Sequence, residues 1–195
     1  MIADAVSDLR ARVGLPVDPA RRGPEPLDRF FAELNLSHVA LPNLTLGGVV
    51  EHLRAEGVPI EDLGEPTAPL AGFLFAAGRI GIAFVRADDT LGRRRFTAAH
   101  ELGHAVLHRA KMGRYLLDAD IVEADDPTAE IEREANRFAV ELLMPEAVIR
   151  ARADELKREH NACPRQVLAY RLSSELLVSK NAISYRLEKL KVGDE

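Results

Sequence analysis

The fold of this chain is decided by the stretch RRFTAAHELGHAVLH, residues 94–108. It contains one HExxH motif, in which His100 and His104 lie four positions apart. On an α-helix two such residues share a face, so both imidazoles can bind one metal ion. Small and apolar residues surround the motif, which predicts a largely buried helix near residues 97–110 with Thr97 as its N-cap.

The same motif also supplies a candidate general base, Glu101. Glu101 points to the neighbouring side of the helix, too far round to be a metal ligand itself. A zinc ion held by the two histidines would lower the pKa of a bound water towards about 7 and polarise a peptide carbonyl. Glu101 would take the proton of that water and pass it to the leaving amine. The pattern predicts a zinc hydrolase with His100 and His104 as ligands and Glu101 as the general base.

A third ligand must come from elsewhere in the chain, because hydrolytic zinc sites carry three protein ligands and one open position. The single cysteine, Cys163, excludes an intrachain disulfide and any site built from two thiolates of one chain. His108 follows His104 by four positions, but a rise of about 1.5 Å per residue places it roughly 12 Å along the helix from His100. We therefore expect His108 at the end of the helix rather than on the metal.

A helix predicted over Thr128–Met144 offers the third ligand. Its apolar residues form one inward stripe, consisting of Ile131, Ala135, Phe138, Ala139, Leu142 and Leu143. Glu132 borders this stripe, and a buried carboxylate needs a partner such as Zn²⁺. Asn136, one turn later, can orient a ligand histidine through its other ring nitrogen. Glu134, on the opposite face, is the alternative ligand if the helix is rotated.

Composition and charge argue against some classes of function. The 195 residues include 26 Lys plus Arg and 31 Asp plus Glu, a net charge of −5. This size fits one globular domain with at most a small appendage, and the acidic balance argues against a protein whose main task is to neutralise phosphates. The longest apolar stretch, residues 70–85, is interrupted by Arg79, so we expect no membrane span. The first residues carry no export signal, which predicts a cytoplasmic protein.

The remaining pattern predicts an α+β fold, mainly helical, with a small antiparallel β-sheet. Apolar residues recur at helical spacing over residues 26–35 and 46–53. Alternation around Phe73 and Phe75, and again from Ile80 to Phe84, predicts a β-hairpin. We divide the chain into an N-terminal helical and linker segment (1–44), a zinc peptidase core (45–160) and a helix-turn-helix-like C-terminal module (161–195).

The C-terminal module supports a rival function. Residues 172–190 read as helix, turn and helix, with Ser179 as the cap of the second helix. A DNA-binding transcriptional regulator, or a toxin–antitoxin-type component, would carry such a module beside a structural or vestigial metal site. However, residues 164–195 hold six Lys plus Arg and four Asp plus Glu, a net charge of only +2. Direct DNA binding is therefore the weaker hypothesis. The triplet Arg93–Arg95 is expected in a solvated loop.

Two blocks of this sequence resemble the ImmA/IrrE family of bacterial zinc metallo-endopeptidases. The first is RRFTAAHELGHAVLH (94–108), and the second comprises EREANRFA (132–139) and ELLMP (141–145). The resemblance covers roughly residues 49–190. It implies a zincin-like, gluzincin-type core in which His100, His104 and Glu132 bind Zn²⁺ and Glu101 is catalytic.

The resemblance also implies a substrate and a way to bind it. Family members cleave a cytoplasmic helix-turn-helix (XRE-type) repressor, often encoded nearby, and so switch on stress-response or mobile-element genes. In gluzincin-like peptidases an edge strand pairs with the extended substrate, and residues 79–85 are the candidate strand. For the group that stabilises the oxyanion, Tyr115 and His108 both remain open.

Overall fold

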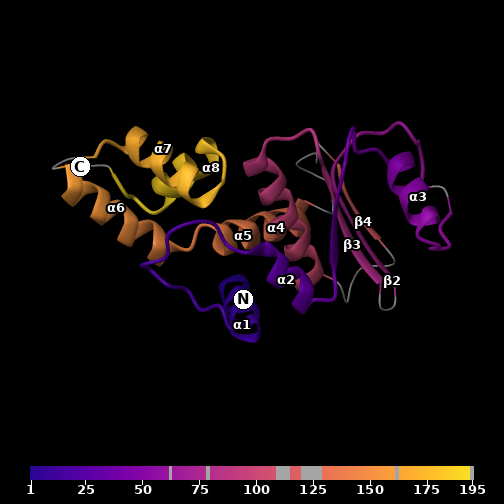
Figure 1. Cartoon of the computed structure of the whole chain (residues 1–195), viewed down its shortest axis with the longest axis horizontal. Helices are drawn as coiled ribbons and strands as arrows, with labels where there is room; N and C mark the ends of the chain where they lie inside the picture. Colours follow the sequence, from indigo (N-terminus) through magenta and orange to yellow (C-terminus); the bar gives the residue numbers. More distant parts are fainter. Residues whose placement is uncertain (62, 78–79, 109–114, 120–128, 161–162, 194–195) are drawn as a thin grey trace.

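The computed structural model describes residues 1–61, 63–77, 80–108, 115–119, 129–160 and 163–193. Over these ranges the chain forms an α+β fold in which helices predominate around one sheet (Figure 1). The helices are α1 (Ile2–Val13), α2 (Leu27–Glu33), α3 (Leu46–Ala55), α4 (Leu91–Leu107), α5 (Ala129–Leu143), α6 (Glu146–His160), α7 (Arg165–Leu176) and α8 (Lys180–Lys189). The strands are β1 (Ser37–Leu41), β2 (Leu70–Ala77), β3 (Ile80–Arg86) and β4 (Tyr115–Ala119). Within the described ranges, no helix combines the length and the apolar character that a bilayer span requires.

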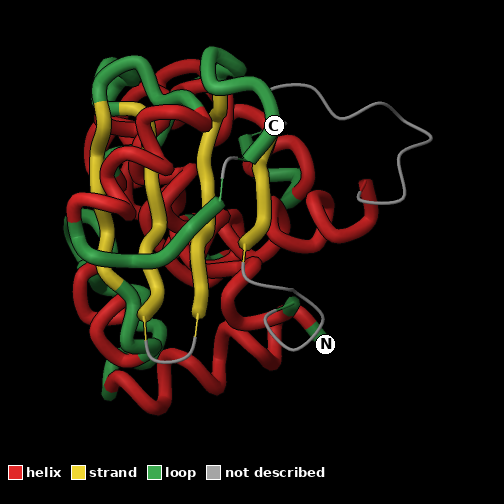
Figure 2. The backbone as a smooth tube through the Cα atoms, turned by 90° about the vertical axis from the view of Figure 1, so that its right-hand side faces the viewer, coloured by secondary structure: helices red, strands yellow, loops and turns green. Residues whose placement is uncertain are grey.

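The sheet has the strand order β1-β3-β2-β4, and its four strands lie side by side in Figure 2. β2 and β3 form the predicted antiparallel hairpin, and β4 pairs antiparallel with β2. β1 pairs parallel with β3, with Ser37 opposite Ile82, so the expectation of a purely antiparallel sheet is wrong for this pair. Sequence analysis missed β1 because the strand has only five residues and none of them is fully buried. Val39 and Leu41 are half-buried, and two such residues are too short a pattern to predict a strand.

The two faces of the sheet pack against different helices. Phe73 and Phe75 of β2 share one hydrophobic cluster with Val49 and Leu53 of α3. Leu74, between them, belongs to a second cluster that includes residues of α4 and α5. This alternation is the period-two pattern of a strand that is covered on both faces. As a result α3 lies on one side of the sheet and α4 on the other (Figure 1).

Helix α4 begins earlier than predicted. Thr90 is its N-cap, and the Thr90 hydroxyl accepts the backbone N–H of Arg93 at 3.4 Å. The predicted cap, Thr97, is instead buried inside the helix. The triplet Arg93–Arg95 is consequently helical and not part of a loop. The helix ends at Leu107 with His108 as its C-cap, and residues 109–110 of the predicted helix lie outside the described residues.

A glycine allows α4 and α5 to approach closely. A Cβ atom on Gly103 would lie 3.1 Å from both the Cα and the carbonyl oxygen of Ala135. Such a separation is tighter than an ordinary van der Waals contact, so a side chain at position 103 would push the two helices apart. The close approach brings the histidine face of α4 next to the first turn of α5.

The helix-turn-helix-like arrangement is present in the C-terminal part of the chain. A three-residue turn joins α7 to α8. Its first residue, Leu177, has a left-handed backbone with φ of 51°, a conformation that glycine adopts at lower cost. Ser179 caps α8, and its hydroxyl accepts the backbone N–H of Ala182 at 3.1 Å.

A buried arginine connects this part of the chain to α5. The Nε atom of Arg186 donates to the carbonyl oxygen of Met144 at 3.0 Å. Its two terminal nitrogens donate to the carboxylate of Glu141 at 3.0 and 2.7 Å. Helix α8 is thereby tied to the C-terminal end of the helix that carries Glu132.

Candidate metal centre

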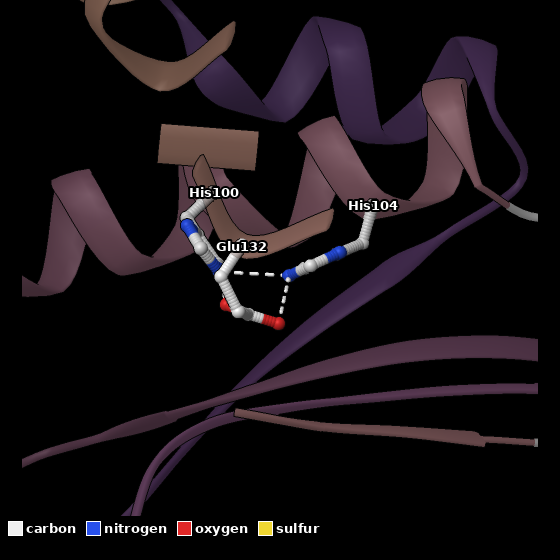
Figure 3. A group of neighbouring side chains, drawn as sticks. All are labelled: His100, His104 and Glu132. Atoms are coloured by element: carbon white, nitrogen blue, oxygen red, sulfur yellow. Dashed lines mark hydrogen bonds and ion pairs between the residues drawn. The ribbon is translucent and has the colours of Figure 1, made fainter. Parts of the chain in front are cut away.

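Three side chains from two helices converge beside the sheet. His100 and His104 come from α4 and Glu132 from the first turn of α5 (Figure 3). The two Nε2 atoms of the histidines lie 2.8 Å apart. The Glu132 carboxylate lies 3.0 Å from Nε2 of His100 and 3.3 Å from Nε2 of His104. One ligand atom from each residue therefore lies within 4.8 Å of the other two.

This group fits a zinc ion in both chemistry and size. Two imidazole nitrogens and a carboxylate oxygen are a common donor set for catalytic zinc. Bonds of about 2.0–2.1 Å to a tetrahedral centre would separate the ligand atoms by about 3.3 Å, close to the distances found here. All three residues are buried, and a buried carboxylate beside two facing imidazoles is the environment that a cation stabilises.

The protonation states of the group suit a metal ligand set. Burial alone would raise the pKa of Glu132, but hydrogen bonds and charge interactions with His100 and His104 lower it to about 2. Burial lowers the pKa of His104 below its usual value, and the contact with Glu132 opposes this only in part. At neutral pH the carboxylate is therefore ionised and His104 is neutral, as metal binding requires.

Asn136 contacts the other side of a histidine ring. Its side-chain oxygen lies 3.2 Å from Nδ1 of His100. An amide oxygen accepts a hydrogen bond, so this contact favours the tautomer in which Nδ1 carries the proton and Nε2 offers a lone pair. Nε2 is the nitrogen that faces His104 and Glu132. The contact with Asn136 is therefore compatible with a His100 ring that presents Nε2 to the other two side chains.

Glu101 lies deeply buried between α4 and β2. Its side chain is fully shielded from solvent. A Cβ atom on Gly72 of β2 would lie only 2.1 Å from Oε1 of Glu101, so the carboxylate occupies the space that a side chain at residue 72 would need. Sequence analysis missed Gly72, because a glycine within an apolar strand can equally mark a bulge or a close backbone approach.

The two other groups considered for the site lie at its border. The carboxylate of Glu134 is half-exposed and lies 3.7 Å from Nε2 of the buried His108. Glu134 is therefore not part of the cluster of three converging side chains, although it lies only two residues from Glu132. His108 is the C-cap of α4, and its ring centre is 5.6 Å from that of His104. The side chain of Tyr115 lies outside the part of the chain that the structure describes.

The strand expected to bind the substrate is the wrong one. β3 pairs with β1 on one side and with β2 on the other, so it has no free edge for a peptide. Among the described strands, β1 and β4 lie at the two edges of the sheet. Sequence analysis could not foresee this, because β1 comes from a segment far from the hairpin and its own pattern is too short to predict a strand.

Comparison with known proteins identifies the family of the chain. The family model described as the IrrE N-terminal-like domain, a peptidase family, matches residues 57–188. The comparison with curated proteins gives no match. The matched region spans more than half of the chain and includes the HExxH motif, Glu132 and Asn136. The chain belongs to the ImmA/IrrE family of metallopeptidases.

Proposed function

We propose that this metallopeptidase is a zinc-dependent endopeptidase that uses His100, His104 and Glu132 as its metal ligands. The observation that carries the proposal is the convergence of these three donors from two helices. Glu101, which follows His100 in the sequence, is fully buried. Membership of a metallopeptidase family implies a divalent metal, and the donor set favours zinc over the harder cations that prefer all-oxygen sites.

The residues around the metal site have different roles in hydrolysis. When bound, zinc would polarise the scissile carbonyl and acidify a water molecule. Glu101 accepts the proton of that water at its carboxylate and delivers it to the amide nitrogen that leaves. Asn136 keeps the His100 ring in the orientation and tautomer that a ligand needs. Burial of Glu101 excludes bulk water from this proton transfer.

Strand β4 is the candidate platform for the substrate. It lies at one edge of the sheet, and its neighbour β2 passes next to Glu101 through Gly72. Strands of the sheet run beside the three ligand side chains (Figure 3). An extended peptide added to this edge would form main-chain hydrogen bonds and would be held near the metal. Residues 115–119 therefore replace residues 79–85 in this role.

The substrate we propose is a helix-turn-helix repressor protein in the cytoplasm. Its cleavage would switch on genes for a stress response or for transfer of a mobile element. This part of the proposal rests on the family resemblance carried by the two sequence blocks around His100 and Glu132.

The test combines a single variant with a metal measurement. Glu101→Gln keeps the size of the side chain but removes its basicity, so the variant should bind one zinc per chain and leave the repressor uncut. Wild-type protein should cut the repressor encoded next to its gene, and a chelator should stop the reaction. Cleavage by Glu101→Gln at the wild-type rate would refute the role of Glu101. Operator binding by the chain that survives chelation, with no cleavage, would favour the DNA-binding alternative.

A further inference from the structure

A cavity of about 750 Å³ lies against the start of α4, between that helix, α2 and the residues around β1. Its wall combines apolar and cationic side chains: Leu27, Phe31, Leu36, Ala98, Arg94 and Arg95. This volume falls in the range of sites for small organic molecules, which are mostly apolar with a few polar groups.

The cavity lies behind the catalytic helix. Helical geometry places Ala98 about 160° around the α4 axis from His100. A molecule in the cavity would contact α4 without reaching the face that carries the two histidines. The site is therefore separate from the candidate metal centre, and the inference does not depend on the proposed function.

Among the described residues neither arginine in the wall forms a salt bridge, although the charge of Glu25 acts on Arg95. Arg95 donates from Nη2 to the carbonyl oxygen of Glu25 at 2.7 Å. The Nε atoms of Arg94 and Arg95 are buried, and neither has an acceptor in the described part of the chain. Arg93, the next residue along the helix, differs because its Nε lies 3.5 Å from Asp89 and its side chain is exposed.

Two acidic residues, Glu25 and Asp28, line the cavity as well. The carboxylate of Glu25 is buried and lies 2.9 Å from Arg10 and 3.5 Å from Arg21, so it is already engaged. Asp28 also lines the cavity, but it is exposed to solvent. The pKa of His38, on the β1 side, is lowered first by desolvation and then by the charge of Arg94. At pH 7 the cavity lining therefore holds the cations Arg94 and Arg95 and a neutral imidazole. It also holds two carboxylates, of which one already pairs with arginines outside the lining and the other is exposed to solvent.

We propose that this cavity binds a small organic anion with an apolar body, of the class of medium-chain carboxylates. A guanidinium binds a carboxylate through two parallel hydrogen bonds, and such charge-assisted bonds are the strong ones in proteins. An anion would supply the acceptors that the buried Nε atoms lack. The apolar wall formed by Leu27, Phe31 and Leu36 would bury the hydrocarbon part.

Titration calorimetry with sodium octanoate tests the proposal on the full chain. Octanoate should bind with one site per chain, whereas 1-octanol, which lacks the charge, and acetate, which lacks the apolar body, should bind at least about tenfold more weakly. Arg94→Gln should weaken octanoate binding by a similar factor. This variant should fold normally because Arg94 has no partner to lose among the described residues.

Two further variants complete the test. Arg93→Gln removes a neighbouring charge that does not line the cavity, so its affinity for octanoate should equal that of the wild type. Arg95→Gln should weaken binding as Arg94→Gln does, and circular dichroism should show both proteins folded. Absence of octanoate binding by the wild type would overturn the proposal. Equal affinity in Arg93→Gln and Arg94→Gln would overturn it as well.

Discussion

Gly72 of β2 leaves the space that the Glu101 carboxylate of α4 occupies. A Cβ atom at residue 72 would lie 2.1 Å from Oε1 of Glu101 and 2.8 Å from Cγ2 of Thr97. Both neighbours are buried side chains of α4, so a Cβ atom at residue 72 would have to displace them. The register of β2 against β4 also shifts between Leu70 and Gly72, next to this contact. The strand thus positions the candidate general base by having no side chain at one residue.

Gly72→Ala should therefore impair catalysis more than metal binding. The added methyl group would displace the Glu101 carboxylate. Misplacement of a catalytic group of this kind lowers the reaction rate by about 100-fold. The atoms nearest to a Cβ at residue 72 belong to Glu101 and Thr97 and not to a metal ligand, so the zinc content should stay near one per chain. We expect kcat to fall with little change in KM, measured on a cleavable repressor.

A second glycine provides the control for that substitution. Gly48 lies in α3, where a Cβ atom would meet nothing closer than 3.5 Å. Gly48→Ala should keep full activity and raise the free energy of unfolding by roughly 0.5–1 kcal/mol. If Gly72→Ala is as active as Gly48→Ala, the contact does not position Glu101.

Glu132 and Glu134 should differ in their effect on metal binding. Glu132→Ala removes one of three converging donors and should abolish stoichiometric zinc binding, measured by competition with a chelating dye. Glu134→Ala should retain zinc, because the Glu134 carboxylate lies beside His108 and outside the cluster. The opposite result would move the third ligand by two residues along α5.

Asn136 should affect zinc affinity without being a ligand. Asn136→Ala removes the acceptor for Nδ1 of His100, and losses of an outer hydrogen bond of this kind weaken metal binding by about 10–100-fold. Asn136→Asp keeps an acceptor at the same place and should restore most of the affinity. The same dye competition distinguishes the two variants, and unchanged affinity in Asn136→Ala would show that the contact is dispensable.

The sequence predicted the helices of the site better than the sheet beside them. The HExxH spacing and the apolar stripe of the second helix are local patterns, so they placed His100, His104 and Glu132 on facing helices. The β2–β3 hairpin is also local, since only two residues of sequence separate its strands. β1 pairs with β3 across more than forty residues, and a mostly exposed five-residue strand carries no signal of such a partner.

Helix caps and contacts between distant helices were also harder to predict, because they depend on packing. Thr90 and Thr97 are both good N-cap residues, and only packing decides that Thr97 is buried inside α4. Glu141 of α5 binds the buried Arg186 from α8, a contact that the pattern within α5 does not predict. Such pairs depend on how distant helices meet, which periodicity within one helix does not encode.

Arg186→Ala tests whether this distant pair stabilises the protein. The substitution leaves the Met144 carbonyl oxygen and the Glu141 carboxylate without their donor in a mostly buried setting. We expect the free energy of unfolding, measured in urea, to fall by about 2–4 kcal/mol. Arg171→Ala, at an exposed position of α7, is the control and should change it by less than about 0.5 kcal/mol.

Arg186→Lys distinguishes the stability that comes from the hydrogen-bond geometry of the pair from the stability that comes from its charge. A lysine keeps the positive charge but cannot bond Glu141 through two nitrogens and Met144 through a third, so it should recover less than half of the lost stability. The double variant Arg186→Ala with Glu141→Ala should be more stable than the sum of the single effects indicates, because each single change leaves the other partner unpaired. Strict additivity of the two substitutions would show that Arg186 acts through the Met144 carbonyl alone.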